Sequence, residues 1–131
     1  MRLCYSLLLA SIAACSSSTS MSSNPPPPPP APPPAPGTVL VSVTEYQFGP
    51  DTIMIAMGTP VRWTNEGMQS HSVVSDTAGL FNSPTLGSGG TNSYGMPQAG
   101  DWYDKTFTTA GTFPYHCGFH ANMHGVVIVS S

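Results

Sequence analysis

Hydrophobic and polar residues alternate in short runs along the chain after residue 37. In the run 38–48, Val39, Val41 and Val43 share one face of an extended segment. Turns rich in Gly and Pro separate the runs, and no segment sustains the 3.6-residue period of an amphipathic helix. The pattern predicts strands at 38–48, 52–57, 61–65, 70–75, 102–108, 112–117 and 125–130.

Short strands with turn residues between them favour an all-β fold, a Greek-key sandwich or barrel of about seven to eight strands. We expect Thr109-Ala110-Gly111 to connect two strands of a hairpin, and 76–101 to be a long irregular segment. In 61–65 the alternation turns Val61 and Trp63 inward. The aromatic residues expected to fill a modest core are Trp63, Trp102, Phe48, Phe107 and Phe113.

The first residues, "MRLCYSLLLASIAAC", have the features of a secretion signal. Arg2 provides the positive start, 7–12 the apolar core, and Ala13-Ala14 the small residues before a cleavage point. The apolar run is too short to span a bilayer as a helix. We therefore expect an exported protein.

The sequence Ile12-Ala13-Ala14-Cys15 resembles the bacterial lipobox, in which the Cys becomes the lipid-modified first residue. The alternative is an ordinary signal peptide that is cut nearby. Several acyl chains on Cys15 would anchor the protein stably to a membrane, since each buried CH₂ contributes about 0.8 kcal/mol. Ser16 follows in place of the Asp that marks inner-membrane retention in many Gram-negative lipoproteins, which favours the outer membrane, facing the periplasm.

Residues 16–37 are of low complexity, first Ser-rich and then Pro-rich. Ten of the twelve residues in 25–36 are Pro, which predicts an extended spacer of roughly 37 Å at ~3.1 Å per residue. A Pro-rich ligand for a partner is the alternative. The chain thus divides into a signal peptide (1–14), a lipidated Cys with a Ser/Pro-rich tether (15–37) and one domain (38–131).

Charge and cysteine content narrow the function. Charged residues make up only 7% of the chain, the formal net charge is −3, and the three basic residues are scattered, so nucleic acid is not an expected partner. Cys4 would leave with the signal and Cys15 would carry lipid, so Cys117 has no partner for a disulfide. In an oxidising compartment such a thiol is either buried and inert or bound to something.

Cys117 belongs to the stretch "YHCGFHANMHG", in which Cys117, His120 and Met123 have the spacing C-x₂-H-x₂-M. Thiolate, imidazole and thioether are the soft ligands expected for copper, with Met as a weak axial ligand. His71 is the one His of the domain outside this stretch, and it would complete a His₂Cys set. Zinc has little use for Met, and structural zinc sites usually contain more cysteines.

Simpler explanations exist for each of these residues taken singly. Cys117 could be a small buried hydrophobe, His71 a hydrogen-bonded residue, and Met123 a packing residue. Alternation sets the two remaining histidines apart, because His116 points away from Cys117 on an extended strand and His124 diverges from Met123. We expect neither to bind the same metal.

The domain 38–131 resembles the cupredoxins, and within them the plastocyanin/amicyanin-like proteins. "AGTFPYHCGFHANMHGVVIV" is similar to their carboxyl-terminal signature, "NEGMQSHSVVSD" to their upstream His region, and "LFNSPTLGSGGTNSYGM" to the loop between. The x₂/x₂ spacing is similar to the short amicyanin loop. In this chain Ser72 follows His71, where several relatives have Asn.

The resemblance implies an eight-stranded β-sandwich with one type 1 copper. It implies that His71, Cys117 and His120 are the strong ligands and Met123 the weak axial ligand. It also implies a carrier of single electrons without catalytic activity.

In the resembled family the His of the terminal loop is the usual electron port. Here that residue is His120, flanked by Phe119 and Ala121, with Met68 and Met96 expected nearby. Partners would then be redox proteins, such as a cytochrome, an oxidase or a reductase, bound transiently. We expect the protein itself to be a monomer.

Three other functions fit parts of the sequence. A multicopper enzyme would need His on both sides of Cys117, but Gly118 follows it, and His116 could serve a catalytic copper only with ligands from another subunit. A copper carrier or storage protein of the cell envelope would use the same ligands as an electron carrier. A metal-free sandwich acting in adhesion is the third.

Overall fold

The structure, a computed structural model, describes residues 31–91, 94–96 and 98–131. The predicted signal peptide, the lipidation of Cys15 and residues 15–30 of the predicted tether lie outside the described residues and remain predictions. Within the described residues, no helix has the length and apolar character required to cross a bilayer.

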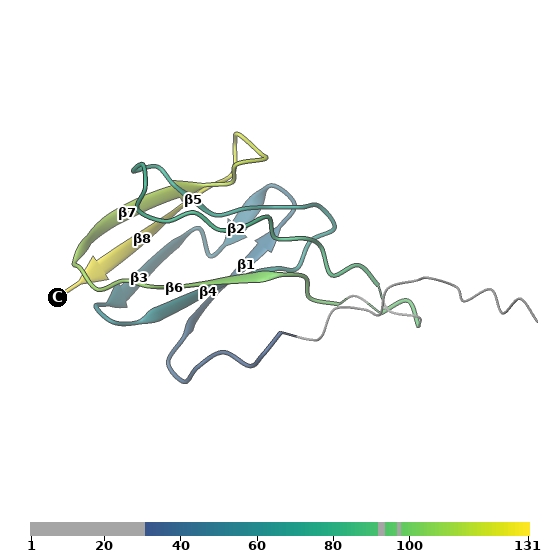
Figure 1. Ribbon diagram of the computed structural model, residues 1–131, viewed down its shortest axis with the longest axis horizontal. Helices are drawn as coiled ribbons and strands as arrows, with labels where there is room; N and C mark the ends of the chain where they lie inside the picture. The colour runs from purple at the N-terminus through teal and green to yellow at the C-terminus, as the bar shows by residue number, and fades with distance from the viewer. Residues whose placement is uncertain (1–30, 92–93, 97) are drawn as a thin grey trace, which may run out of the picture.

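The described chain forms eight strands in two four-stranded sheets that pack face to face (Figure 1). The first sheet has the order β2 (Gln47–Gly49), β1 (Val39–Thr44), β4 (Pro60–Asn65), β6 (Trp102–Thr106). The second has the order β3 (Thr52–Ala56), β8 (His124–Ser130), β7 (Gly111–His116), β5 (Val74–Ser75). β1 pairs with β4 and β3 with β8 in parallel, and the other pairs are antiparallel. The all-β sandwich predicted from the sequence is confirmed.

The predicted strand 38–48 is two strands in the structure. Tyr46 has a φ of 65°, a left-handed conformation that reverses the chain, so that β2 folds back on β1 with Val43 opposite Phe48. Both Val43 and Phe48 are buried. The alternation changes phase at this turn, since the buried positions are odd-numbered up to Val43 and even-numbered at Phe48, but no Gly or Pro marks the turn in the sequence.

Two other predictions about strands were wrong. Residues 102–108 and 112–117 do not form a hairpin, because β6 lies in the first sheet and β7 in the second. The connection between them passes from one sheet to the other, and its residue Phe107 is buried. The predicted strand 70–75 is regular only at β5, while His71 forms an isolated bridge with Leu86.

The core lies between the sheets and is built around Trp63, whose side chain is fully buried. Its ring lies 5.5 Å from that of Tyr115 and 6.5 Å from that of Phe107, centroid to centroid. Trp102 is only partly buried, contrary to expectation, and the Arg62 guanidinium lies 5.6 Å from the centroid of its ring. The buried apolar residues are Val41, Val43, Phe48, Ile53, Ile55, Val61, Trp63, Val73, Phe81, Leu86, Phe107, Tyr115, Cys117, Met123, Val127 and Val129.

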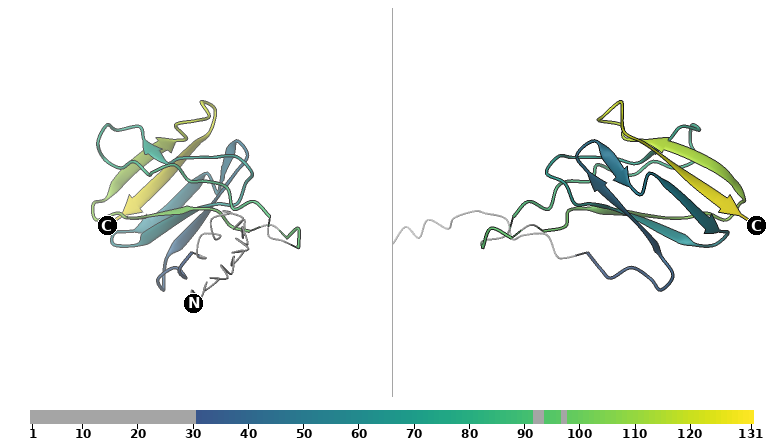
Figure 2. Two further views of the ribbon diagram at one scale, coloured as in Figure 1. Left: turned by 45° about the vertical axis from the view of Figure 1, so that its right-hand side comes forward. Right: turned by 180° about the vertical axis from the view of Figure 1, so that it is seen from behind.

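This packing places one loop, 117–123, between the last two strands. It stands at the end of the sandwich opposite the C-terminus (Figures 1 and 2). The turn that contains Tyr46 and the segment before β5 reach the same end, because the Tyr46 and His71 rings both lie close to the ring of His120.

The packing of Tyr115 on β8 yields a prediction. A Cβ added at Gly125 would lie 2.3 Å from Cζ of the fully buried Tyr115 ring, so Gly125→Ala must displace the ring or the strand. We expect the free energy of unfolding in urea to fall by about 1–3 kcal/mol. Gly49→Ala is the matched control, since its Cβ would meet no atom nearer than 4.0 Å. Equal stability of the two variants would contradict this packing.

Candidate metal centre

His71 is fixed by backbone pairing just before β5. Its N–H donates to the Leu86 carbonyl at 3.0 Å, and its carbonyl accepts from the Leu86 N–H at 2.8 Å. The buried Asn65 amide donates to the carbonyls of Gln69 and Leu86 at 2.7 and 2.9 Å, and its oxygen accepts from the Gly67 N–H at 2.9 Å. Hydrogen bonds within the protein therefore position the segment that carries His71, without the help of a metal.

The loop 117–123 presents the other predicted ligands and is closed by its own hydrogen bonds. The Cys117 N–H donates to the Met123 carbonyl at 2.9 Å, and the Met123 N–H donates to the His120 carbonyl at 3.1 Å. Cys117 and Met123 are buried, whereas His120 is partly exposed. The loop thus turns a sulfur inward at both ends and brings one imidazole to the surface.

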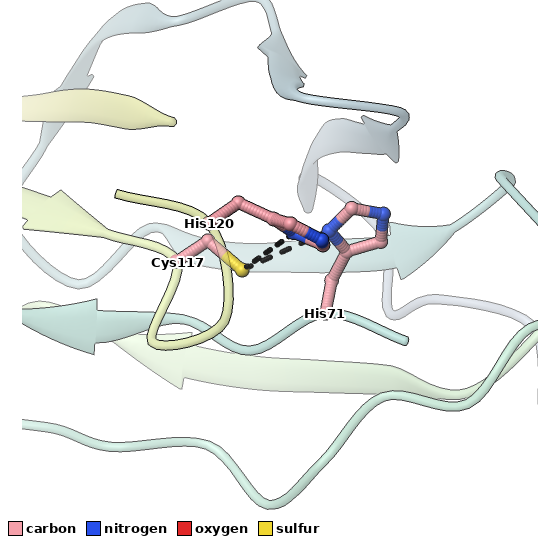
Figure 3. Close-up of side chains that lie close together, drawn as sticks. All are labelled: His71, Cys117 and His120. Carbon is pink, nitrogen blue, oxygen red and sulfur yellow. Dashed lines mark hydrogen bonds between the residues drawn. The ribbon is translucent and has the colours of Figure 1, made fainter. Parts of the chain in front are cut away.

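The side chains of His71, Cys117 and His120 point toward one another (Figure 3). Sγ of Cys117 lies 3.7 Å from Nδ1 of His71 and 3.6 Å from Nδ1 of His120. The ligand atoms of these three side chains all lie within 4.8 Å of one another. The structure brings together three of the four predicted ligands, and the fourth, Met123, lines the same surface hollow as His120.

These separations fit a metal ion bound in the middle. With bonds of ~2.0 Å to nitrogen and ~2.3 Å to sulfur and trigonal angles, the sulfur and each nitrogen would be roughly 3.6–3.8 Å apart. Two imidazoles and a cysteine sulfur with a nearby thioether form the donor set that copper prefers. The residues present therefore fit copper without a change of fold.

Ser72 connects the two ligand-bearing segments. Its backbone N–H donates to Sγ of Cys117 at 3.4 Å, and its hydroxyl oxygen accepts from the Gly118 N–H at 2.9 Å. A hydrogen bond to the sulfur stabilises the thiolate form that a metal requires. The hydroxyl contact joins residues that are 46 positions apart in the sequence.

Burial lowers the pKa of His71 below its ordinary value of 6.5, and the neighbouring His120 lowers it further, while Glu45 acts in the opposite direction. The neutral imidazole, which is the form that binds metals, is therefore favoured. Nε2 of His71 is buried without a hydrogen-bond partner among the described residues. The orientation of the ring thus depends on backbone anchoring and packing.

The exposed side of the site is apolar and includes a residue that the sequence did not indicate. Tyr46 stands edge-on to His120, with ring centroids 5.1 Å apart. Tyr46, His120, Ala121, Asn122 and Met123 line a hollow of about 270 Å³. Phe119 is 54% exposed and Tyr46 63% exposed. Tyr46 reaches this position through the reversal between β1 and β2, which the prediction of a single strand over 38–48 missed.

His116 and His124 are directed elsewhere, as alternation suggested. His116 lies on the outer face of the second sheet, where its Nδ1 is 2.5 Å from Oδ1 of Asp76. Its ring centroid lies 6.3 Å from that of the exposed His124. Neither belongs to the group around Cys117.

Comparison with known proteins agrees with this site. A family model described as copper binding proteins of the plastocyanin/azurin family matches residues 37–130. Amicyanin from Paracoccus denitrificans is 30% identical over 95 residues, which is 72% of this chain and 67% of the amicyanin. The chain therefore belongs to the plastocyanin/azurin family of copper-binding proteins. This confirms the predicted cupredoxin class and its cofactor, copper.

Solved structures show the same fold. The reduced state of an amicyanin variant is 29% identical, with a TM-score of 0.58 over 73% of this chain and 85% of that one. A purple cupredoxin from Nitrosopumilus maritimus is 27% identical, with a TM-score of 0.57 over 70% of this chain and 99% of that one. A copper-containing nitrite reductase from Thermus scotoductus is 28% identical, with a TM-score of 0.58 over 71% of this chain. The match covers only 22% of the reductase chain, so the likeness concerns that part of it alone.

The role of Ser72 in connecting the two ligand-bearing segments can be tested by removing its hydroxyl. Ser72→Ala keeps the backbone N–H that donates to Cys117 but removes the acceptor for Gly118. We expect the free energy of unfolding in urea to fall by about 1 kcal/mol, with the copper–thiolate absorption retained. The exposed Ser70 provides the matched control, and Ser70→Ala should change stability by less than about 0.5 kcal/mol. A Ser72→Ala protein as stable as Ser70→Ala would refute the bridge.

Proposed function

We propose that this protein is a type 1 copper protein that carries single electrons in the bacterial cell envelope. His71, Cys117 and His120 are the strong ligands and Met123 is the weak axial ligand. The observation that carries the proposal is the group of two imidazole nitrogens and one cysteine sulfur, all within 4.8 Å of one another. Bound copper would supply the Cu(II)/Cu(I) couple. Plastocyanin-like and amicyanin-like cupredoxins are electron carriers, which supports the proposed role in electron transfer.

The residues around the site suit electron transfer better than catalysis. His71 and Cys117 are buried, so no substrate could reach them, and only the edge of His120 opens to solvent among the three clustered donors. Gly118 follows Cys117, where a multicopper enzyme would need a second His. We therefore propose that the protein catalyses no reaction and passes electrons through His120.

The partner surface that we propose surrounds His120 and consists of Tyr46, Phe119 and Ala121. It is small and apolar, which suits a weak and transient encounter with a redox protein. Met68 is exposed, as expected for a residue of such a surface, and its N–H donates to the Glu45 carboxylate next to Tyr46. Attachment through a lipidated Cys15 to the outer membrane, with the domain in the periplasm, is supported by the leader and tether sequences.

The copper assignment is tested by adding Cu(II) to the purified metal-free protein. We expect the first equivalent to give an intense thiolate-to-copper band near ~600 nm, as a trigonal copper–thiolate site requires. Cys117→Ala should abolish the band, because the sulfur that produces it is gone. A folded native protein without this band would refute the copper site.

Variants of the other residues separate ligands from bystanders. Met123→Leu should keep the colour but change the reduction potential measured by voltammetry, since the axial ligand tunes it. When loaded with one copper and no other metal, His116→Ala and His124→Ala should have the same colour and the same reduction potential as the native protein. Loss of the blue band in His116→Ala would contradict the ligand assignment.

A further inference from the structure

The two histidines outside the copper site face each other on the outer surface of the second sheet. His116 on β7 and His124 on β8 are direct register partners. The adjacent pair, Cys117 and Met123, is joined by a backbone hydrogen bond. Hydrogen-bonded and non-hydrogen-bonded pairs alternate along an antiparallel ladder, so His116 and His124 form a non-hydrogen-bonded pair. Side chains approach each other most closely in such pairs.

A carboxylate orients one of these rings. Nδ1 of His116 lies 2.5 Å from Oδ1 of Asp76, which leaves Nε2 of His116 available. Metal-binding histidines commonly use one ring nitrogen for the metal and the other for a carboxylate in this way. The His116 and Asp76 side chains are 36% and 41% exposed, and His124 is exposed, so an ion from solvent can reach all three.

We propose that His116 and His124 form a second metal site, for a divalent ion of the Zn²⁺ or Cu²⁺ kind, with Asp76 as the carboxylate that positions His116. Imidazole is a preferred ligand of these ions, and water completes the coordination. A metal bound at ~2.0 Å by one nitrogen of each ring sets the ring centroids roughly 5–6 Å apart. The observed 6.3 Å needs only a small rotation of an exposed side chain.

A second carboxylate lies on the other side of His124. A hollow of about 420 Å³ is lined by Asp51, Asn122 and His124, together with residues of β2. The positioning role belongs to Asp76 because that carboxylate already contacts an imidazole nitrogen. Asp51 therefore serves as the matched control.

The two sites are close in the chain, because His116 immediately precedes the copper ligand Cys117. Their side chains face opposite sides of the sheet. An ion bound there brings positive charge close to the copper. Nearby positive charge favours the less positive Cu(I) over Cu(II), so the reduction potential should rise. This effect rests on the proposed function, whereas the second site does not.

The test is a calorimetric titration of Zn²⁺ into the protein already loaded with one copper. We expect one further equivalent to bind to the native protein. His116→Gln and His124→Gln should each weaken this binding at least tenfold, and Asp76→Asn should weaken it by about tenfold or more. Asp51→Asn should bind Zn²⁺ as the native protein does, and Ca²⁺, which prefers oxygen ligands, should not bind at this site.

Unchanged Zn²⁺ binding in the double variant of His116→Gln and His124→Gln would overturn the site. Retention of the blue band in each variant shows that the fold and the copper site are intact. The same titration in Cys117→Ser, with and without the two His→Gln changes, isolates the second site by difference, because His71 and His120 contribute equally to both measurements. Failure of the copper assignment and failure of the second site are therefore distinguishable.

The electrostatic effect has its own measurement. Voltammetry of the copper-loaded protein should show a higher potential after Zn²⁺ is added, and no change in His124→Gln. Zn²⁺ binding at His116 and His124 without a rise in potential would overturn the coupling between the two sites.

Discussion

Two imidazole nitrogens and one cysteine sulfur must stay within a few ångströms of one point, although water is excluded from two of the three side chains. This constraint explains much of the molecule. His71 and Cys117 are 46 positions apart in the sequence, so only tertiary structure can bring them together. The bridge between His71 and Leu86, the closed loop 117–123 and the Ser72 hydroxyl each fix one part of the group. Burial lowers the pKa of His71 and so favours the neutral imidazole, whose lone pair is free to bind a metal.

The same constraint determines how the site can communicate with a partner. A site whose ligands are positioned by the backbone changes little when the charge of its metal changes, and a small rearrangement favours rapid electron transfer. The sandwich encloses Cys117 and His71, and it leaves the edge of His120 beside Tyr46 at the surface. The exit that we propose for an electron is therefore apolar. Its polar surroundings are the turn of Glu45 and the loop that begins at Glu66, both of which carry exposed acidic side chains.

Local sequence patterns were sufficient for the fold class and for part of the site. The spacing of Cys117, His120 and Met123 could be interpreted because a single loop positions all three. His71 could be added because it is the one His of the domain outside the stretch 115–125. By contrast, the Ser72 hydroxyl and the Asn65 amide act through groups on distant segments, and no local pattern reveals such partners. The reversal at Tyr46 was missed because no Gly or Pro marks that turn, whereas the incorrect hairpin at 109–111 has another cause. Alternation shows which side chains point inward, but not which sheet receives the strand.

We infer that the fold holds a site that accepts both oxidation states with little rearrangement, as an electron carrier requires and a copper carrier does not. The electron self-exchange rate, measured from proton NMR spectra of mixtures of the Cu(I) and Cu(II) proteins, reports this rearrangement. A rigid site predicts fast exchange, so resonances of the reduced protein near His120 should broaden in proportion to the oxidised fraction, with copper retained throughout. Resonances that stay sharp at every ratio, or transfer of Cu(I) to a soluble chelator on the same timescale, would show that the site is not built for electron transfer.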